Sequence, residues 1–74
     1  MPASSAANSV AILLVGDELL SGRCVDGNGA WLARALDARG VVLHSIEILG
    51  DDPVTIENAI TRACGMVDLV IVSG

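Results

Sequence analysis

The sequence predicts an α/β domain of three layers (α/β/α), in which helices cover both faces of a mainly parallel β-sheet. The first observation is an unbroken apolar run at residues 10–15 (VAILLV), which is typical of a strand buried on both faces. The second is that strand-length apolar runs alternate along the chain with segments of helical periodicity. The third is that these helical segments are short, as crossovers between parallel strands are.

A first helix is expected over residues 29–39, after a long connection that runs from Gly16 to Gly27. Asn28 is a good N-cap for it, and Gly40 is suited to the left-handed conformation that ends many helices. Apolar residues at helical spacing form one face of this helix. They are Trp31, Leu32, Ala35 and Leu36.

A second strand is expected over residues 41–49, with side chains that alternate between the two faces of the sheet. One face would carry Val42, His44, Ile46 and Ile48, and the other Val41, Leu43, Ser45 and Glu47. Because the latter face ends in polar residues, this strand is predicted to lie nearer an edge than the first. A second helix follows, with Asp52 as N-cap, Pro53 at its first position and Gly65 at its end. Residues 69–72 are expected to form a third, buried strand.

The composition excludes some classes of function. Nine acidic residues against four arginines give the 74-residue chain a net charge of −5, which argues against binding to nucleic acid. Cys24 and Cys64 lie far apart and are expected to be reduced thiols in a cytoplasmic protein. No stretch resembles a secretory signal or approaches the roughly 20 apolar residues of a membrane helix. No membrane association is therefore expected.

The predicted domain boundaries follow from the same patterns. Residues 1–9 are mostly small and are expected to be a flexible N-terminal tail. Residues 10–74 are expected to be the N-terminal part of a longer domain, truncated just after its third strand.

The predicted strand order is 2-1-3, which places the topological switch point between the first and third strands. Ligands of such sheets bind outside the carboxyl ends of the strands. Three segments meet at that edge: Gly16-Asp17-Glu18, Gly50-Asp51-Asp52 and Ser73-Gly74. Gly16 is expected to let the chain turn sharply. Asp17 and Glu18 are candidates to hold a divalent metal through water or to bind a ligand hydroxyl or amine, although two solvated loop acids are an equally simple interpretation.

The remaining polar residues near this edge have structural alternatives. Asp52 is explained by its capping role, whereas Asp51 is not and is a candidate catalytic residue, with an exposed loop acid as the alternative. Asp26 and Asn28 flank Gly27, and capping or turn formation explains them as well as contact with a ligand does. The segment is not a P-loop, because it lacks the lysine and the glycine spacing of that motif.

Four motifs in order resemble the molybdopterin-binding (molybdenum cofactor biosynthesis) domain family. They are VGDELLSG, VDGNGAWLARALDARG, ILGDDPVTIENAI and DLVIVSG, which together run from about Ala11 to Gly74. Gly22 follows the Gly-Asp-Glu-Leu-Leu-Ser run directly, which resembles the competence/damage-inducible protein A (CinA) subtype and the N-terminal domain of eukaryotic FAD synthases.

The resemblance implies a ligand pocket at the carboxyl edge of the sheet in a domain that is commonly oligomeric. It implies that a pterin or nucleotide phosphate binds near Gly16, Asp17, Glu18, Asp26 and Asn28. Ser73 and Gly74 match the start of the family's glycine-rich loop, whose amides bind phosphate. Asp51 matches an acid that is linked to catalysis in related adenylyltransferases.

Two classes of function follow from the resemblance. CinA-like domains are associated with metal-dependent hydrolysis of ADP-ribose-type pyrophosphates, in which a divalent metal held by Asp17 and Glu18 would act with Asp51. The alternatives are a module for ligand binding or oligomerisation without catalysis, or a protein of molybdenum cofactor biosynthesis. A phosphoacceptor receiver domain fits less well, because its third strand should close in an aspartate.

Overall fold

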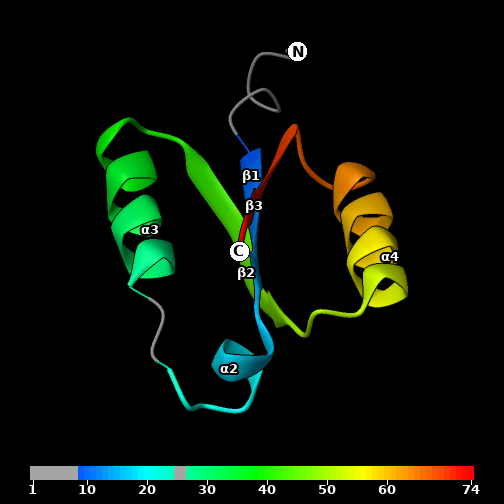
Figure 1. Cartoon of the computed structure of the whole chain (residues 1–74). Helices are drawn as coiled ribbons and strands as arrows, with labels where there is room; N and C mark the ends of the chain where they lie inside the picture. Colours follow the sequence, from blue (N-terminus) through cyan, green and yellow to red (C-terminus); the bar gives the residue numbers. More distant parts are fainter. Residues whose placement is uncertain (1–8, 25–26) are drawn as a thin grey trace.

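The computed structural model describes residues 9–24 and 27–74. Three parallel strands form one sheet in the order β2-β1-β3, which confirms the predicted α/β class and strand order. Helix α3 lies on one face of the sheet and α4 on the other, so the molecule has three layers (Figure 1). The elements in chain order are β1 (Ser9–Val15), α2 (Asp17–Leu20), α3 (Asn28–Ala38), β2 (Val42–Leu49), α4 (Pro53–Cys64) and β3 (Leu69–Ser73).

Strand β1 is the centre of the core, as its unbroken apolar run predicts. Its alternate side chains enter two separate apolar clusters, one on each face of the sheet. Ile12, fully buried, packs on the α3 side with Leu32 and Leu36, and Leu13, 1% exposed, packs on the α4 side with Ala59. A strand buried on both faces cannot alternate apolar and polar residues, which is why this segment is apolar throughout.

Strand β1 begins at Ser9, one residue earlier than the sequence predicted. The Ser9 hydroxyl donates to Asp68 Oδ2 at 3.0 Å and accepts from the Asp68 backbone amide at 3.2 Å. These bonds tie the start of β1 to the segment that leads into β3. The rest of the predicted N-terminal tail lies outside the described residues.

Helix α3 starts one residue before the predicted position. Asn28 is its first residue and Gly27 is the N-cap, so the prediction of Asn28 as N-cap was wrong. The reason is that the Gly27 carbonyl already accepts the Trp31 amide at 3.2 Å. Trp31 was expected on the apolar face but is 62% exposed. Beyond the helix, Gly40 has φ +74°, the left-handed conformation expected there.

Strand β2 contains an irregularity that changes which side chains share a face. Val10 pairs with Leu43, whereas Ala11 pairs with Ser45, so one residue of β2 has no partner on β1. The alternation predicted across residues 41–49 is therefore broken at His44. Leu43 packs with Ile12 on the α3 side, while Glu47 bonds to Arg62 of α4 on the other side. Because such a bulge depends on pairing with β1, periodicity along β2 alone could not predict it.

Helix α4 begins as the sequence predicted, with Asp52 as N-cap, Pro53 at the first position and Gly65 after the last residue. Strand β3 differs from the prediction. It is at the outer edge of the described sheet, and its Leu69 and Val72 are 55% and 47% exposed. None of the described helices is long and apolar enough to cross a membrane.

Candidate functional site at the carboxyl edge of the sheet

The three segments that end β1, β2 and β3 come together, as the parallel sheet requires. The Gly16 amide donates to the Leu49 carbonyl at 2.9 Å, which joins the end of β1 to the end of β2. On the other side, Ser73 pairs with Leu14, and Gly74 lies against Val15. The short helix α2 and the turn between β2 and α4 occupy this edge, at the bottom of Figure 1.

Asp17 and Asp51 are held together by two reciprocal hydrogen bonds. The Asp51 backbone amide donates to Asp17 Oδ1 at 3.0 Å, and the Asp17 amide donates to Asp51 Oδ2 at 3.3 Å. We call this pair of bonds the Asp17–Asp51 clamp. Each carboxylate has one oxygen in the clamp, which leaves Asp17 Oδ2 and Asp51 Oδ1 without a bond to the other residue. The structure thus brings the candidate catalytic acid and a candidate metal ligand into direct contact.

Gly50 precedes Asp51 and lies close to the carboxylate of Asp17. A Cβ atom at this position would be 2.8 Å from Asp17 Oδ1 and 3.4 Å from Leu20 Cδ2. The first distance is shorter than real Cβ contacts permit. Close approach of the two acids therefore depends on the absence of a side chain between them. The sequence placed Gly50 in a turn at this edge, but its contact with Asp17 was not predicted, because Asp17 is 33 residues away along the chain.

Gly16 has a different role from the one predicted. Its φ of 161° is extended backbone, so a sharp turn does not require a glycine here. The carboxylate of Glu18 instead folds back over Gly16, and an added Cβ would lie 2.9 Å from Glu18 Oε2. Glu18 is exposed and is in the first turn of α2 beside Asp17. The two acids are neighbours, but only Asp17 takes part in the clamp.

The electrostatics of the clamp favour a cation. Within residues 9–24 and 27–74, neither Asp17 nor Asp51 forms an ion pair with an arginine, and Arg62 is paired with Glu47 instead. Two adjacent carboxylates repel each other unless a positive charge is supplied. No group of three or more potential ligands gathers among the described residues. A carboxylate pair still fits Mg²⁺, which commonly uses one or two carboxylates and completes its shell with water and substrate phosphates.

The two other predicted polar residues do not join this cluster. Asn28 begins α3, and no hydrogen bond between described residues connects it to either acid of the clamp. Asp26 lies outside the described residues. The structure therefore assembles Gly16, Asp17, Glu18, Asp51, Ser73 and Gly74 at one edge of the sheet. It shows no bond from Asn28 to these residues within the described part of the chain.

Asp52, next to Asp51, has a structural role. Its Oδ2 accepts the Thr55 hydroxyl at 2.7 Å and the Thr55 amide at 3.0 Å. These bonds, the hydroxyl first, hold the pKa of the Asp52 carboxyl below its ordinary value of 3.8. The two adjacent aspartates thus have different roles: Asp52 caps α4, and Asp51 is in the clamp.

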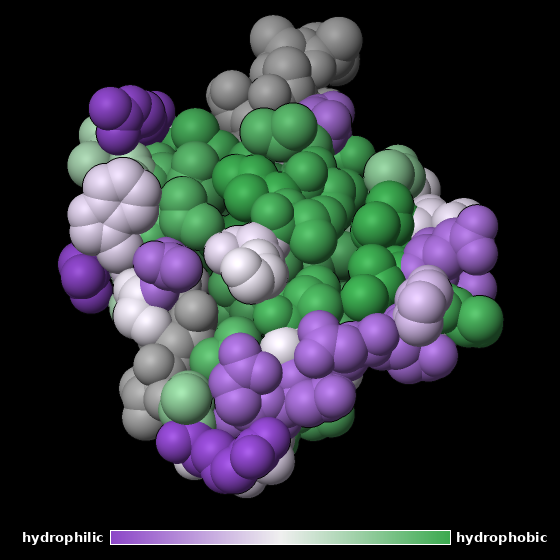
Figure 2. Space-filling view, in the orientation of Figure 1, coloured by the Kyte–Doolittle hydropathy of each residue, from purple (hydrophilic) through white to green (hydrophobic). Residues whose placement is uncertain are grey.

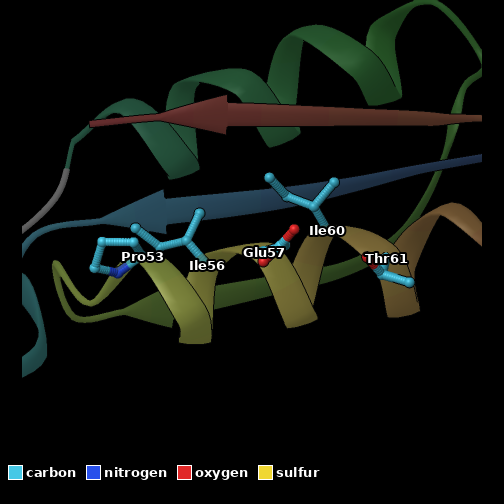
Figure 3. Close-up of a pocket in the computed structure, with 5 residues that line it drawn as sticks. All are labelled: Pro53, Ile56, Glu57, Ile60 and Thr61. Carbon is cyan, nitrogen blue, oxygen red and sulfur yellow. The ribbon is translucent and has the colours of Figure 1, made fainter.

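An apolar groove begins beside this turn but does not contain the acids. It has a volume of about 540 Å³ and is lined by Pro53, Ile56, Glu57, Ile60 and Thr61. Ile56 and Ile60 point from α4 toward the strands (Figure 3). Because none of the acids of the clamp lines it, the groove is a flank of α4 and not the candidate catalytic site.

Comparison with known proteins decides the family. A family model described as "Probable molybdopterin binding domain" matches residues 11–74, nearly the whole chain. The chain belongs to this molybdopterin-binding domain family. Within the family its sequence is CinA-like: it is 49% identical over 63 residues to a "CinA-like protein" of Deinococcus deserti, a match that covers 85% of this chain. It is 39% identical over 66 residues to a "Probable FAD synthase" of Caenorhabditis elegans, with 89% of this chain covered.

The fold of this molybdopterin-binding domain also has a solved counterpart. A crystal structure of a CinA protein of unknown function from Thermoplasma acidophilum superposes with a TM-score of 0.87 at 32% identity. The match covers 92% of this chain and 40% of that one. The chain spans 16% of the Deinococcus protein and 13% of the Caenorhabditis protein. The match therefore covers only a small part of each of those proteins.

Proposed function

We propose that this molybdopterin-binding domain binds the phosphates of a nucleotide or pterin at the carboxyl edge of its sheet. As part of the complete gene product, it hydrolyses the pyrophosphate bond of an ADP-ribose-type nucleotide with the help of a divalent metal. The observation that supports this proposal is the clamp, which joins two carboxylates without a neutralising arginine. We further propose that the protein is a cytoplasmic homo-oligomer, as the family resemblance implies.

Each residue of this edge has a role in the proposed reaction. The free carboxylate oxygens of Asp17 and Asp51, with Glu18 beside them, would hold the metal, which would polarise a phosphoryl oxygen and position water. Asp51 would be the catalytic carboxylate. Ser73 and Gly74, at the end of β3, would contact the phosphates through backbone amides. These groups bind and orient the substrate before its pyrophosphate bond is broken.

Asp51 is expected to be required for hydrolysis. In the complete gene product, Asp51→Asn should lower the rate of ADP-ribose hydrolysis with Mg²⁺ about 100-fold or more. The fold should survive, because an asparagine oxygen can still accept the Asp17 amide. Circular dichroism checks the fold, and release of AMP measures turnover.

The adjacent acid provides the matched control for this prediction. Asp52→Asn changes the same chemical group one residue away, keeps an oxygen for the cap and should leave turnover near the wild-type rate. Equal turnover of the Asp51→Asn variant and the wild type would overturn the catalytic assignment.

A binding module without catalysis is the second candidate, and a specific observation favours it. No group of three potential metal ligands gathers among the described residues, so a metal at this edge would need further ligands from water or from the substrate. Calorimetric titration with ADP-ribose, with and without Mg²⁺, separates the two candidates. Binding without turnover under either condition supports a module for ligand binding, such as one in molybdenum cofactor biosynthesis.

A further inference from the structure

Gly50 is the residue on which the geometry of the clamp depends. It connects Leu49, which is 5% exposed and pairs with Val15, to Asp51, whose amide donates to Asp17 Oδ1. The same Asp17 oxygen is the atom that a Cβ at Gly50 would approach to 2.8 Å. A side chain at Gly50 would thus displace the acceptor of the Asp51 amide.

The backbone around Asp17 offers little room for adjustment. The Gly16 amide is bonded to the Leu49 carbonyl, and the Asp17 amide is bonded to Asp51 Oδ2. An aspartate side chain is short, so its carboxylate cannot move far while its own backbone is held. To relieve a contact with Gly50, Asp17 would have to rotate its carboxylate away and break the bond to the Asp51 amide.

The conformation of Gly50 itself is not the reason for a glycine. Among the described residues, only Gly22 and Gly40 have a φ in the left-handed range that disfavours a side chain. Alanine can therefore adopt the backbone conformation of Gly50 without strain. The effect of a substitution would come from the contact with Asp17 alone, and it would remove no charged or polar group from the site.

We propose that Gly50 is a positioning residue that acts through Asp17 to hold Asp51 in its active orientation. The inference rests on the proposed function, since Asp51 has a reaction to orient only if the site is catalytic. Displacement of a catalytic group by about 1 Å can cost about 100-fold in rate. A single methyl group at Gly50 should therefore reduce catalysis although every acid of the site is retained.

The test compares two glycine-to-alanine variants of the complete gene product. Gly50→Ala should lower kcat for ADP-ribose hydrolysis about 10- to 100-fold, with a much smaller change in KM. Gly65→Ala is the matched control, because its Cβ would meet only the Arg62 carbonyl, at an ordinary 3.6 Å. Equal kcat values for the two variants would overturn the proposal.

A double-mutant cycle tests the same contact without reference to activity. Gly50→Ala should lower the Tm and speed hydrogen exchange of the Asp51 amide in the wild-type background. In an Asp17→Ala background, where the clashing oxygen is gone, the additional Tm decrease should largely disappear. If Gly50→Ala lowers the Tm as much in the Asp17→Ala background as in the wild-type background, the contact is refuted. This holds even if Gly50→Ala folds too poorly for kinetics. If the wild type hydrolyses no ADP-ribose, the proposed function fails, whereas the cycle still decides whether Gly50 positions the clamp.

Discussion

At the scale of single residues, the structure separates carboxylates that look alike in the sequence. Asp51 and Asp52 are adjacent, but Asp51 Oδ2 accepts an amide from the end of β1 and Asp52 Oδ2 accepts two groups of Thr55 in its own helix. The bonds of Asp52 lie within one turn, so its capping role was predictable from the sequence. The bonds of Asp51 join segments 34 residues apart and depend on how the strands pair.

Asp52 should make stability depend on pH. Because its pKa is lower in the folded state than in the unfolded state, the charged cap stabilises the fold above 3.8, and this contribution is lost as the pH falls through the lowered value. Asp52→Ala should thus reduce the Tm at neutral pH, and its difference from wild type should shrink in acid. Thermal unfolding followed by circular dichroism measures both. A difference that stays constant into strong acid would contradict this assignment, and Asp52→Asn, which keeps the cap oxygen, is the control.

At the scale of elements, the position of a strand within the sheet determines how much its side chains contribute to stability. Ile12 of β1 pairs with Ile46 of β2, so the two isoleucines are neighbours on the same face of the sheet. Ile12 is fully buried, whereas Ile46 is 44% exposed because β2 is an edge strand. Glu47 and Arg62 connect β2 to α4 at 2.7 Å, but both side chains are substantially exposed, so this ion pair adds at most about 1 kcal/mol.

The paired isoleucines provide a matched comparison. Ile12→Ala should lower the free energy of unfolding by about 2–5 kcal/mol, because it removes buried methyl groups and leaves a cavity. Ile46→Ala should cost roughly half as much or less, since part of its side chain is already in water. Urea unfolding measures both variants. Equal decreases in the free energy of unfolding would indicate that β2 is as well covered as β1. That result would contradict the structure.

At the scale of the whole molecule, polar and apolar surfaces are segregated. Figure 2 shows a broad hydrophobic area between the two helices, bordered by hydrophilic residues over α2 and the β2–α4 turn. Leu69 and Val72 of β3 contribute exposed apolar surface. Among the described residues, no strand pairs with the outer edge of β3. An apolar edge strand with free backbone groups favours association with other chains.

Self-association of this 74-residue chain should therefore depend on β3. Val72→Lys places a charge on that edge strand and should reduce concentration-dependent association, as measured by sedimentation velocity. Val54→Lys is the control, because Val54 is similarly exposed (61%) but is on helix α4 and not on the edge of the sheet. If both variants associate as the wild type does, β3 is not the surface responsible.

Much of the fold was predictable because its determinants are local. The apolar run of β1, the Asp52-Pro53 start of α4 and Gly40 after α3 each act within a few residues, and the structure confirmed them. The start of α3, the faces of β2 and the exposure of β3 were predicted wrongly. The faces of β2 and the exposure of β3 depend on pairing and covering by other segments, which periodicity along one strand does not contain.

The sequence alone was enough to predict that three chain segments, two of them acidic, meet at one edge of the sheet. A parallel sheet places the carboxyl ends of its strands together, so the order of the elements was sufficient. Which atoms meet there depends on the three-dimensional packing of the chain. The Asp17–Asp51 clamp and the space left by Gly50 depend on the register of β1 against β2. That register is set by packing of both helices on the sheet, a balance of contacts between segments distant along the chain.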